Sequence, residues 1–123
     1  MLKKKKFKNV HITEKIALFY LRLKGYHLIE KNFTVHNGTG AGEIDIIMRK
    51  GKTIIFVEVK KRKTYLLAAQ AIDINTQLRI VKSSAVFFQK HPEYSSFQVR
   101  YDAVLFKDKS FWPEHMKSAW RVL

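Results

Sequence analysis

The chain of 123 residues contains no cysteine, and this absence rules out disulfide bonds and zinc sites built from thiolates. Its five histidines, at positions 11, 27, 36, 91 and 115, show no paired spacing typical of a metal site. No apolar run approaches the roughly 18–20 residues that span a bilayer. The lysine-rich start also lacks the apolar segment of a signal peptide. We therefore expect a cytoplasmic protein that does not enter a membrane.

Acidic residues are scarce, with ten Asp and Glu against 24 Lys and Arg, which gives a net charge of +14. Such a charge on a small domain causes self-repulsion, and a polyanionic partner is the usual reason for it. Nucleic acid, DNA in particular, is the leading candidate. An anionic membrane surface is the second candidate, and solubility alone is the third. The 46% hydrophobic and 13% aromatic residues argue against disorder and suffice for one core.

The hydrophobic pattern predicts a single domain over residues 9–123, preceded by a basic arm over residues 1–8. The first element is a helix with Thr13 as its N-cap and Gly25 just past its end. Its buried face is expected to hold the apolar residues at helical spacing, which are Ile12, Ile16, Phe19, Tyr20 and Leu23. Residues 26–35 alternate in the manner of a strand, and the glycine-rich residues 36–42 indicate a flexible loop.

Two apolar strands, residues 43–49 and 53–60, follow around a Lys-Gly pair typical of a hairpin turn. After residues 65–74, a loop or a short helix, a second helix begins near Asn75 and ends before Pro92. The residues expected on its buried face are Leu78, Val81, Ala85 and Phe88.

Residues 97–106 predict a fourth strand, and residues 112–120 predict a short amphipathic helix. The second helix is long enough to bring the fourth strand back in parallel with a neighbour. The order of elements therefore predicts an α/β fold in which a mixed sheet is flanked by helices.

Charged residues interrupt the two hairpin strands where burial is expected. If residues 50–51 form the centre of the turn, Asp45 lies opposite Phe56 and Glu43 opposite Glu58. One face of the hairpin then carries the charged residues Glu43, Asp45, Glu58 and Lys60. The other face carries the apolar residues Ile44, Ile46, Val57 and Val59.

Three carboxylates beside a single ammonium group leave a negative charge that is unfavourable to bury without compensation. A divalent cation that prefers hard oxygen ligands, Mg²⁺ or Mn²⁺, would balance this charge. The alternative is a solvent-exposed strand end on which the same residues are surface charges or an ion pair.

The hairpin resembles the PD-(D/E)XK nuclease superfamily, whose signature is an acid on one strand and Glu-X-Lys on the next, here Asp45 and then Glu58-Val59-Lys60. The αβββαβ core of that restriction-endonuclease-like fold has the order predicted above. More closely, the chain resembles the YraN-like family of small bacterial proteins. The matching segments are TEKIALFYLRLKGYHLIEKNF (13–33), GEIDII (42–47), FVEVKKR (56–62), RYDAVL (100–105) and EHMKSAW (114–120). Ile44 stands where the superfamily has proline, and Thr76 where the family has lysine.

This resemblance implies a Mg²⁺-dependent endonuclease, with Mn²⁺ as an alternative metal, that hydrolyses phosphodiester bonds in DNA, including branched or otherwise structured DNA. Asp45 and Glu58 would ligate the metal, and Glu14 matches an acid that related nucleases carry near it. Lys60 would position the attacking water and stabilise the charge that develops on the phosphate. The alternative is a non-catalytic nucleic-acid-binding protein that retains the fold.

Further residues are expected around this site. Glu43 and Gln77 would support the catalytic residues, whereas His115 would pack and Arg100 would pair with Asp102. The basic residues expected to contact phosphates are Lys3, Lys4, Lys5, Lys6, Lys61, Arg62 and Lys63. Both a monomer and a homodimer are compatible with the sequence.

Overall fold

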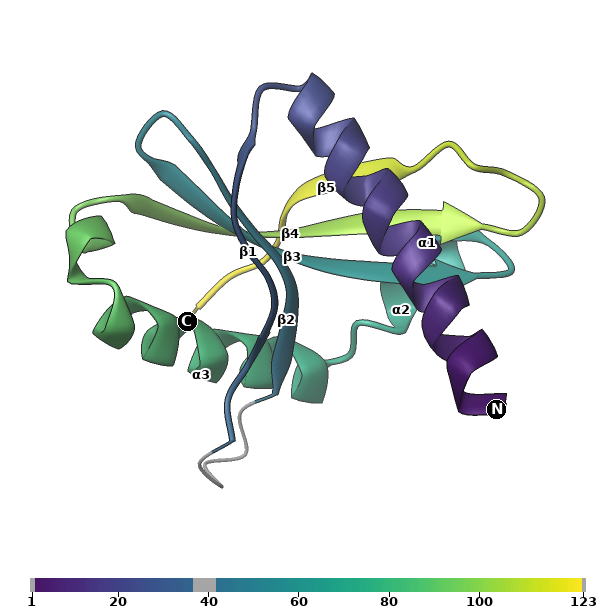
Figure 1. Ribbon diagram of the computed structural model, residues 1–123, viewed down its shortest axis with the longest axis horizontal. Helices are drawn as coiled ribbons and strands as arrows, with labels where there is room; N and C mark the ends of the chain where they lie inside the picture. The colour runs from purple at the N-terminus through teal and green to yellow at the C-terminus, as the bar shows by residue number, and fades with distance from the viewer. Residues whose placement is uncertain (1, 37–41, 123) are drawn as a thin grey trace.

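The computed structural model describes residues 2–36 and 42–122, with side chains from residue 12 onward. The elements are α1 (Leu2–Leu23), β1 (His27–Thr34), β2 (Glu43–Lys50), β3 (Thr53–Arg62), α2 (Tyr65–Gln70), α3 (Ile74–Lys90), the 3₁₀ turn η1 (Pro92–Tyr94), β4 (Gln98–Lys107) and β5 (Glu114–Trp120). The strands form one sheet of order β1-β2-β3-β4-β5, in which only β3 and β4 pair in parallel (Figure 1). The predicted mixed sheet is confirmed, and the fold is consistent with a restriction-endonuclease-like core. The expected loop at residues 36–42 lies largely outside the described residues.

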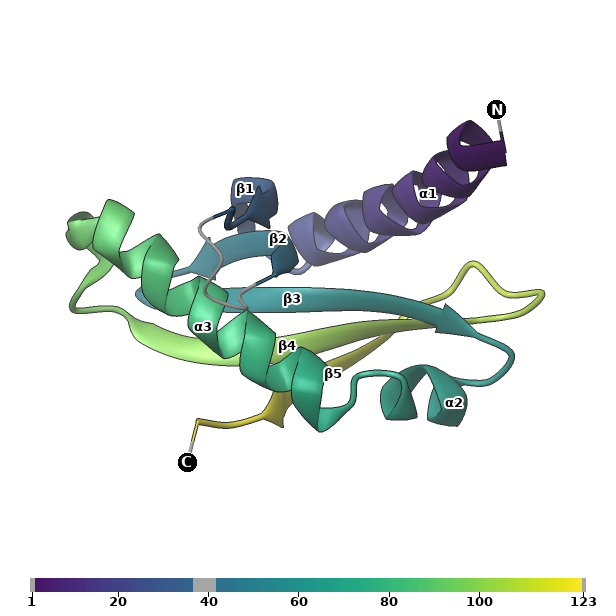
Figure 2. The ribbon, with the colours of Figure 1, turned by 90° about the horizontal axis from the view of Figure 1, so that it is seen from below.

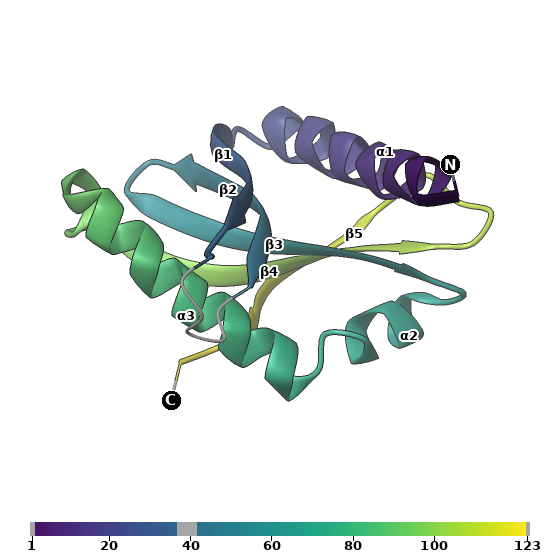
Figure 3. The same cartoon turned by 60° about the horizontal axis from the view of Figure 1, so that its bottom comes forward.

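The sheet lies between two helical layers (Figure 3). On one face, Ala17, Leu18 and Leu21 of α1 pack against strand residues that include Val57 and Val104. On the other face, α2 and α3 cover a cluster that includes Phe56 and Leu105. Each layer therefore buries its own core, and the strands between them read as continuous apolar runs. Within residues 2–36 and 42–122, no helix is both long enough and apolar enough to cross a membrane.

The first helix differs from the prediction in its start and in its buried face. α1 begins at Leu2, so Thr13 does not cap it and the basic segment belongs to the helix, whose first turns stand away from the sheet (Figure 2). Among the side chains of α1 that the structure describes, residues 12–23, the buried ones are Glu14, Ala17, Leu18 and Leu21. In contrast, Ile12, Phe19 and Leu23, predicted to be buried, are 49%, 63% and 72% exposed. Apolar residues surround most of this helix, so their spacing alone does not select the face that meets the sheet.

The end of α1 is as predicted. Gly25 has a φ of +96°, which side chains with a Cβ rarely adopt. The amide of Gly25 donates to the carbonyl of Arg22 at 3.0 Å, and that of Tyr26 donates to Leu21 at 3.1 Å. These two bonds form a Schellman motif, which ends the helix and turns the chain into β1.

The β2–β3 hairpin forms where expected, but with a different register. Lys50 pairs with Thr53, so the central residues of the turn are Gly51 and Lys52, and Ile47 rather than Asp45 faces Phe56. Gly51 has a φ of +58° at the first central position, as a type II′ turn requires. The predicted turn would have required a positive φ at a lysine. Each paired residue therefore faces a partner two positions away from the predicted one. A shift of an even number of residues keeps the paired side chains on their predicted faces of the hairpin.

Two later elements correct the prediction. Asp73, not Asn75, caps α3, because its carboxylate accepts from the amide of Thr76 at 2.9 Å. The fully buried residues of α3 are Ile80, Ser83, Ser84 and Phe87, while Leu78 of the predicted face is 51% exposed.

The last segment is not a helix but the edge strand β5, which pairs antiparallel with β4. A segment of this length gains too few helical hydrogen bonds to be stable alone, whereas pairing with β4 satisfies its backbone.

A buried carboxylate holds β5 to the sheet. Asp102 is fully buried and accepts from Arg100 Nε and Nη2, both at 2.8 Å, and from the Ser118 amide at 3.1 Å. Because a carboxylate only accepts, His115 Nε2 donates the fourth bond, at 2.8 Å. Burial would raise the pKa of Asp102, but these hydrogen bonds lower it below its usual value. The expected pairing of Arg100 and packing of His115 are confirmed.

Candidate functional site

The strands β2 and β3 separate at the residues predicted to be catalytic. The last residues that pair between these strands are Ile46 and Val57. Beyond them the Asp45 side chain replaces the strand pairing, because its Oδ2 accepts a hydrogen bond from the Val59 amide at 2.8 Å. The facing of β2 changes here, because Ile46 packs toward α1 while Ile44 packs in the cluster beneath α3. The prediction that Ile44 and Ile46 share one face is therefore wrong. The separation of the strands opens the sheet beside Asp45.

Four acidic side chains gather at this opening. One carboxylate oxygen from each of Glu14, Glu43 and Asp45 lies within 4.8 Å of the others. Glu58 lines the same hollow as Glu14 and Asp45. Glu14 comes from α1, so three elements supply the four acids, and two of the acids, Glu14 and Glu58, are only 6% and 7% exposed.

The crowding of acids changes their ionisation. Burial raises the pKa of Glu58 to about 9, with further increases from the hydrogen bond and charge of Asp45, against a lowering by Lys60. Burial likewise raises the pKa of Glu14 to about 7, and the charges of Asp45 and Glu43 add to this effect. Without a bound cation, the cluster therefore holds protons at neutral pH that isolated carboxyl groups would release.

The sequence analysis missed Asn32 of β1. In the amide orientation that satisfies its hydrogen bonds, its nitrogen donates to Glu14 Oε1 at 2.9 Å and to Glu43 Oε1 at 3.0 Å. Its backbone has a φ of +53°, which is rare within a strand and which Asn tolerates better than most residues. An Asn in the middle of a strand-like segment was the available signal, because strands are depleted in Asn.

Lys60 is the cation that the structure places among the acids, with Nζ 3.7 Å from Glu58 Oε2. A hollow of about 280 Å³, here called the acid hollow, opens beside this pair toward α1. Its lining residues are Thr13, Glu14, Asp45, Glu58, Val59, Lys60, Lys61 and Arg62. Asp45 and Glu58 also line a second hollow, on the α3 side, together with Thr76 and Arg79.

The remaining predicted residues are placed differently. Lys61 and Arg62 line the acid hollow, whereas Lys63 is exposed and does not line it. The side chains of Lys3 to Lys6 lie outside the described part of the chain. Gln77 is not brought to the acids, because its amide donates to the Ile72 carbonyl at 3.0 Å and it lines a separate small cavity.

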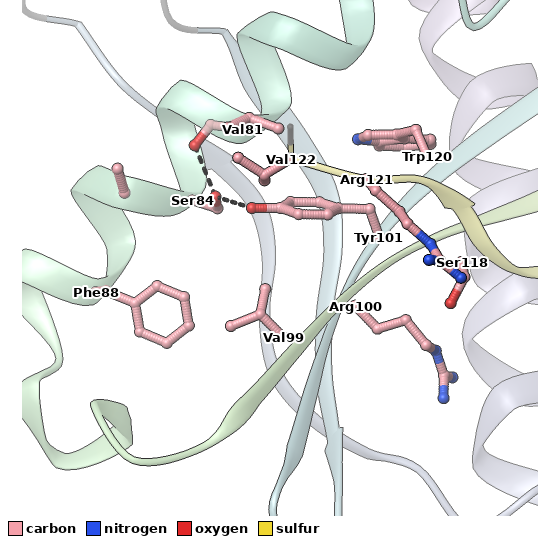
Figure 4. Close-up of a pocket in the computed structure, with 11 residues that line it drawn as sticks. Val81, Ser84, Phe88, Val99, Arg100, Tyr101, Ser118, Trp120, Arg121 and Val122 are labelled. Carbon is pink, nitrogen blue, oxygen red and sulfur yellow. Dashed lines mark hydrogen bonds between the residues drawn. The ribbon is translucent and has the colours of Figure 1, made fainter.

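A larger cavity, of about 580 Å³, lies elsewhere, between α3 and the ends of β4 and β5. Figure 4 shows Tyr101 reaching across it to Ser84, with the two hydroxyl oxygens 2.7 Å apart. Trp120 stacks on Tyr101 with ring centroids 5.8 Å apart. None of the described residues that line this cavity is acidic, so its size does not make it a metal site.

The donor set at the acid hollow fits a hard divalent cation. Carboxylate oxygens are the ligands that Mg²⁺ and Mn²⁺ prefer; Glu14, Glu43 and Asp45 bring such oxygens within 4.8 Å of one another, and Glu58 lines the acid hollow beside Glu14 and Asp45. Burial, with added repulsion between the acids, raises the pKa values of Glu14 and Glu58, and a bound cation would favour their ionised forms. The ligand roles of these residues stay predictions.

Comparison with known proteins finds relatives along most of the chain. A UPF0102 protein of Methylocella silvestris is 40% identical over 108 residues, covering 88% of this chain and 83% of the relative. A UPF0102 protein of Paramagnetospirillum magneticum is 38% identical over 111 residues, covering 90% and 85%. Residues 13–106, which include Glu14, Asp45, Glu58 and Lys60, match the family described as Uncharacterised protein family UPF0102. The chain therefore belongs to the UPF0102 family.

Proposed function

We propose that this protein is a metal-dependent endonuclease of the PD-(D/E)XK type that hydrolyses phosphodiester bonds in DNA. One observation carries the proposal: Asp45 of β2 and Glu58 and Lys60 of β3 meet at a single hollow where the two strands separate. An acid on one strand and Glu-X-Lys on the next is the signature of that superfamily. Buried acids with raised pKa values are also typical of catalytic centres.

Asp45, Glu58 and Glu14 would hold Mg²⁺ or Mn²⁺, and the carbonyl of Val59 would be a further ligand. When bound, such a cation polarises a phosphoryl oxygen and lowers the pKa of water. The Val59 amide fixes the Asp45 carboxylate by donating to Oδ2, and Asn32 orients Glu14 and Glu43 by donating to both. These hydrogen bonds position the acids before a substrate arrives.

Lys60 supplies a positive charge beside Glu58. Its Nζ lies 3.7 Å from Glu58, and its side chain is 27% exposed, so it is accessible from the acid hollow. There it would stabilise the negative charge that develops on a phosphate under attack and help to orient the attacking water. Lys61 and Arg62 at the rim of the hollow would hold the flanking phosphates.

The test is a cleavage assay on linear duplex, flapped and four-way DNA with Mg²⁺ or Mn²⁺, using wild type and Glu58→Ala side by side. Wild type should cut at least one substrate only when metal is added, and Glu58→Ala should cut none while still binding DNA. The matched control is Glu114→Ala, which removes an exposed acid of β5 and should leave cleavage unchanged. If wild type binds every substrate but cleaves none of them with either metal, the proposal of an enzyme must be replaced by that of a non-catalytic nucleic-acid-binding protein.

A further inference from the structure

Large apolar side chains remain exposed at the end of the molecule next to the acid hollow. Phe111 and Trp112, in the loop between β4 and β5, are 78% and 70% exposed, and Ile12 of α1 is 49% exposed. The N-terminal half of α1, the end of β3 and this loop gather at the same end of the molecule (Figures 1 and 3). Adjoining exposed apolar side chains of this kind mark binding surfaces more often than single ones do.

Ile12 and Phe111 border a hollow of about 370 Å³, here called the aromatic hollow. Its lining residues are Ile12, Thr13, Ile16, Lys61, Phe106, Ser110 and Phe111. Thr13 and Lys61 also line the acid hollow, so the two hollows share a wall. A ligand held at the acids can therefore extend past Lys61 directly onto the apolar surface.

We propose that the aromatic hollow binds an unpaired base of the nucleic acid whose phosphate lies at the acid hollow. This proposal rests on the proposed function and names its substrate class as DNA that is single-stranded or locally unpaired beside the scissile phosphate. The occupant follows from chemistry and charge. A nucleotide joins a flat apolar base to an anionic phosphate. The protein places the apolar aromatic hollow on one side of Lys61 and the acid hollow on the other, and the chain carries a net charge of +14.

The exposed aromatic ring favours an unpaired base over a duplex. In a duplex both faces of each base are stacked on neighbouring bases, so a protein reaches only the edges and the phosphates. Aromatic side chains stack on bases that are splayed out of the helix, and this contact tolerates any sequence because every base has a flat face. Phe111, at 78% exposed, has the free ring face that such stacking needs.

The loop that carries Phe111 is held in place by its neighbours. The Tyr65 hydroxyl donates to the Trp112 carbonyl at 2.6 Å, and the Trp112 amide donates to Ser110 Oγ at 3.2 Å. The ring of Trp112 packs edge-on against Tyr20 with centroids 5.7 Å apart. Because these contacts already order the loop, stacking a base on Phe111 costs little additional entropy.

The test measures binding without cleavage, in EDTA, of a 12-nucleotide oligothymidylate and of a 12-base-pair duplex. The variants are Phe111→Ala, Phe111→Trp, which keeps a stacking ring, and Phe19→Ala. Phe19 is 63% exposed on α1 and lines neither hollow, so it is the matched control for lost apolar surface. Loss of one base stack weakens binding by roughly 5- to 150-fold.

We expect Phe111→Ala to weaken oligothymidylate binding within that range and duplex binding by less than about twofold. Phe111→Trp should retain wild-type affinity, and so should Phe19→Ala. Equal losses on both DNA forms, or no loss on either, would overturn the proposal. Because no metal is present, the outcome is separate from the nuclease test: Phe111-dependent single-strand binding can hold without cleavage, and cleavage can hold without it.

Discussion

Replacing Glu58 by glutamine should stabilise the metal-free protein, and increasingly so as the pH rises. Burial and Asp45 raise the pKa of Glu58 from 4.5 in an isolated side chain to about 9 in the fold. Between these values the folded protein holds a proton that the unfolded chain releases. Stability is therefore greatest below the unfolded pKa and is lost as the pH rises toward the folded pKa.

The size of the effect follows from the same two values. One such group lowers the free energy of unfolding by about 1.4 kcal/mol per pH unit within this window. Between pH 5.5 and 7.5 the loss is about 3 kcal/mol. A glutamine side chain cannot ionise, so Glu58→Gln should escape this loss, while Glu14 and the histidines titrate in both proteins and cancel in the difference.

The assay is urea unfolding in EDTA at pH 5.5, 6.5 and 7.5 for wild type, Glu58→Gln and Glu114→Gln. Glu114 is exposed, so its variant should follow wild type at every pH. The difference between Glu58→Gln and wild type should widen by about 3 kcal/mol across the range. A difference that stays constant with pH, within about 0.5 kcal/mol, would refute the assignment of a raised pKa to Glu58.

Three further outcomes are expected. Lys60→Ala should abolish cleavage yet keep most DNA affinity, whereas Lys61→Ala should weaken binding and still cut at saturating DNA. Single-turnover cleavage and equilibrium binding measure the two effects. Equal behaviour of the two variants in both assays would count against a catalytic Lys60. Duplex affinity should fall with salt at a slope near −0.9 per phosphate contact in a plot of log K against log salt, and a flat plot would assign the +14 charge another purpose. Asp102→Ala should lower the free energy of unfolding by about 3–5 kcal/mol, because it leaves Arg100 without its buried partner, while exposed Asp108→Ala should change it by less than about 0.5 kcal/mol.

The sequence predicted the fold where local rules decide it. Alternating apolar residues gave the strands, Gly25 gave the end of α1, and the length of α3 gave the parallel pairing of β3 and β4. The prediction failed for segments whose residues are compatible with more than one local structure or buried face. α1 is apolar on most sides, and the last segment becomes a strand only because β4 and the buried Asp102 receive it.

The candidate site was predictable in part. Alternation placed Asp45 and Glu58 together, and the structure brings them together although the strand pairing differs by two residues and the facing of β2 changes between Ile46 and Ile44. The contribution of Asn32 was not predictable, since it depends on a bulged β1 and on a backbone of positive φ beside Glu14 and Glu43. Contacts between α1, β1 and β2 are tertiary, and the spacing within one segment carries no information about them.

The location of a bound divalent cation tests the metal centre most directly. Mn²⁺ scatters anomalously, so crystals soaked in MnCl₂ would show its position independently of any activity. We predict an anomalous peak about 2.0–2.6 Å from carboxylate oxygens of both Asp45 and Glu58, and no peak there in Glu58→Gln crystals. A fully occupied Mn²⁺ elsewhere, with no anomalous peak beside Asp45 and Glu58, would contradict the metal centre and with it the proposed nuclease.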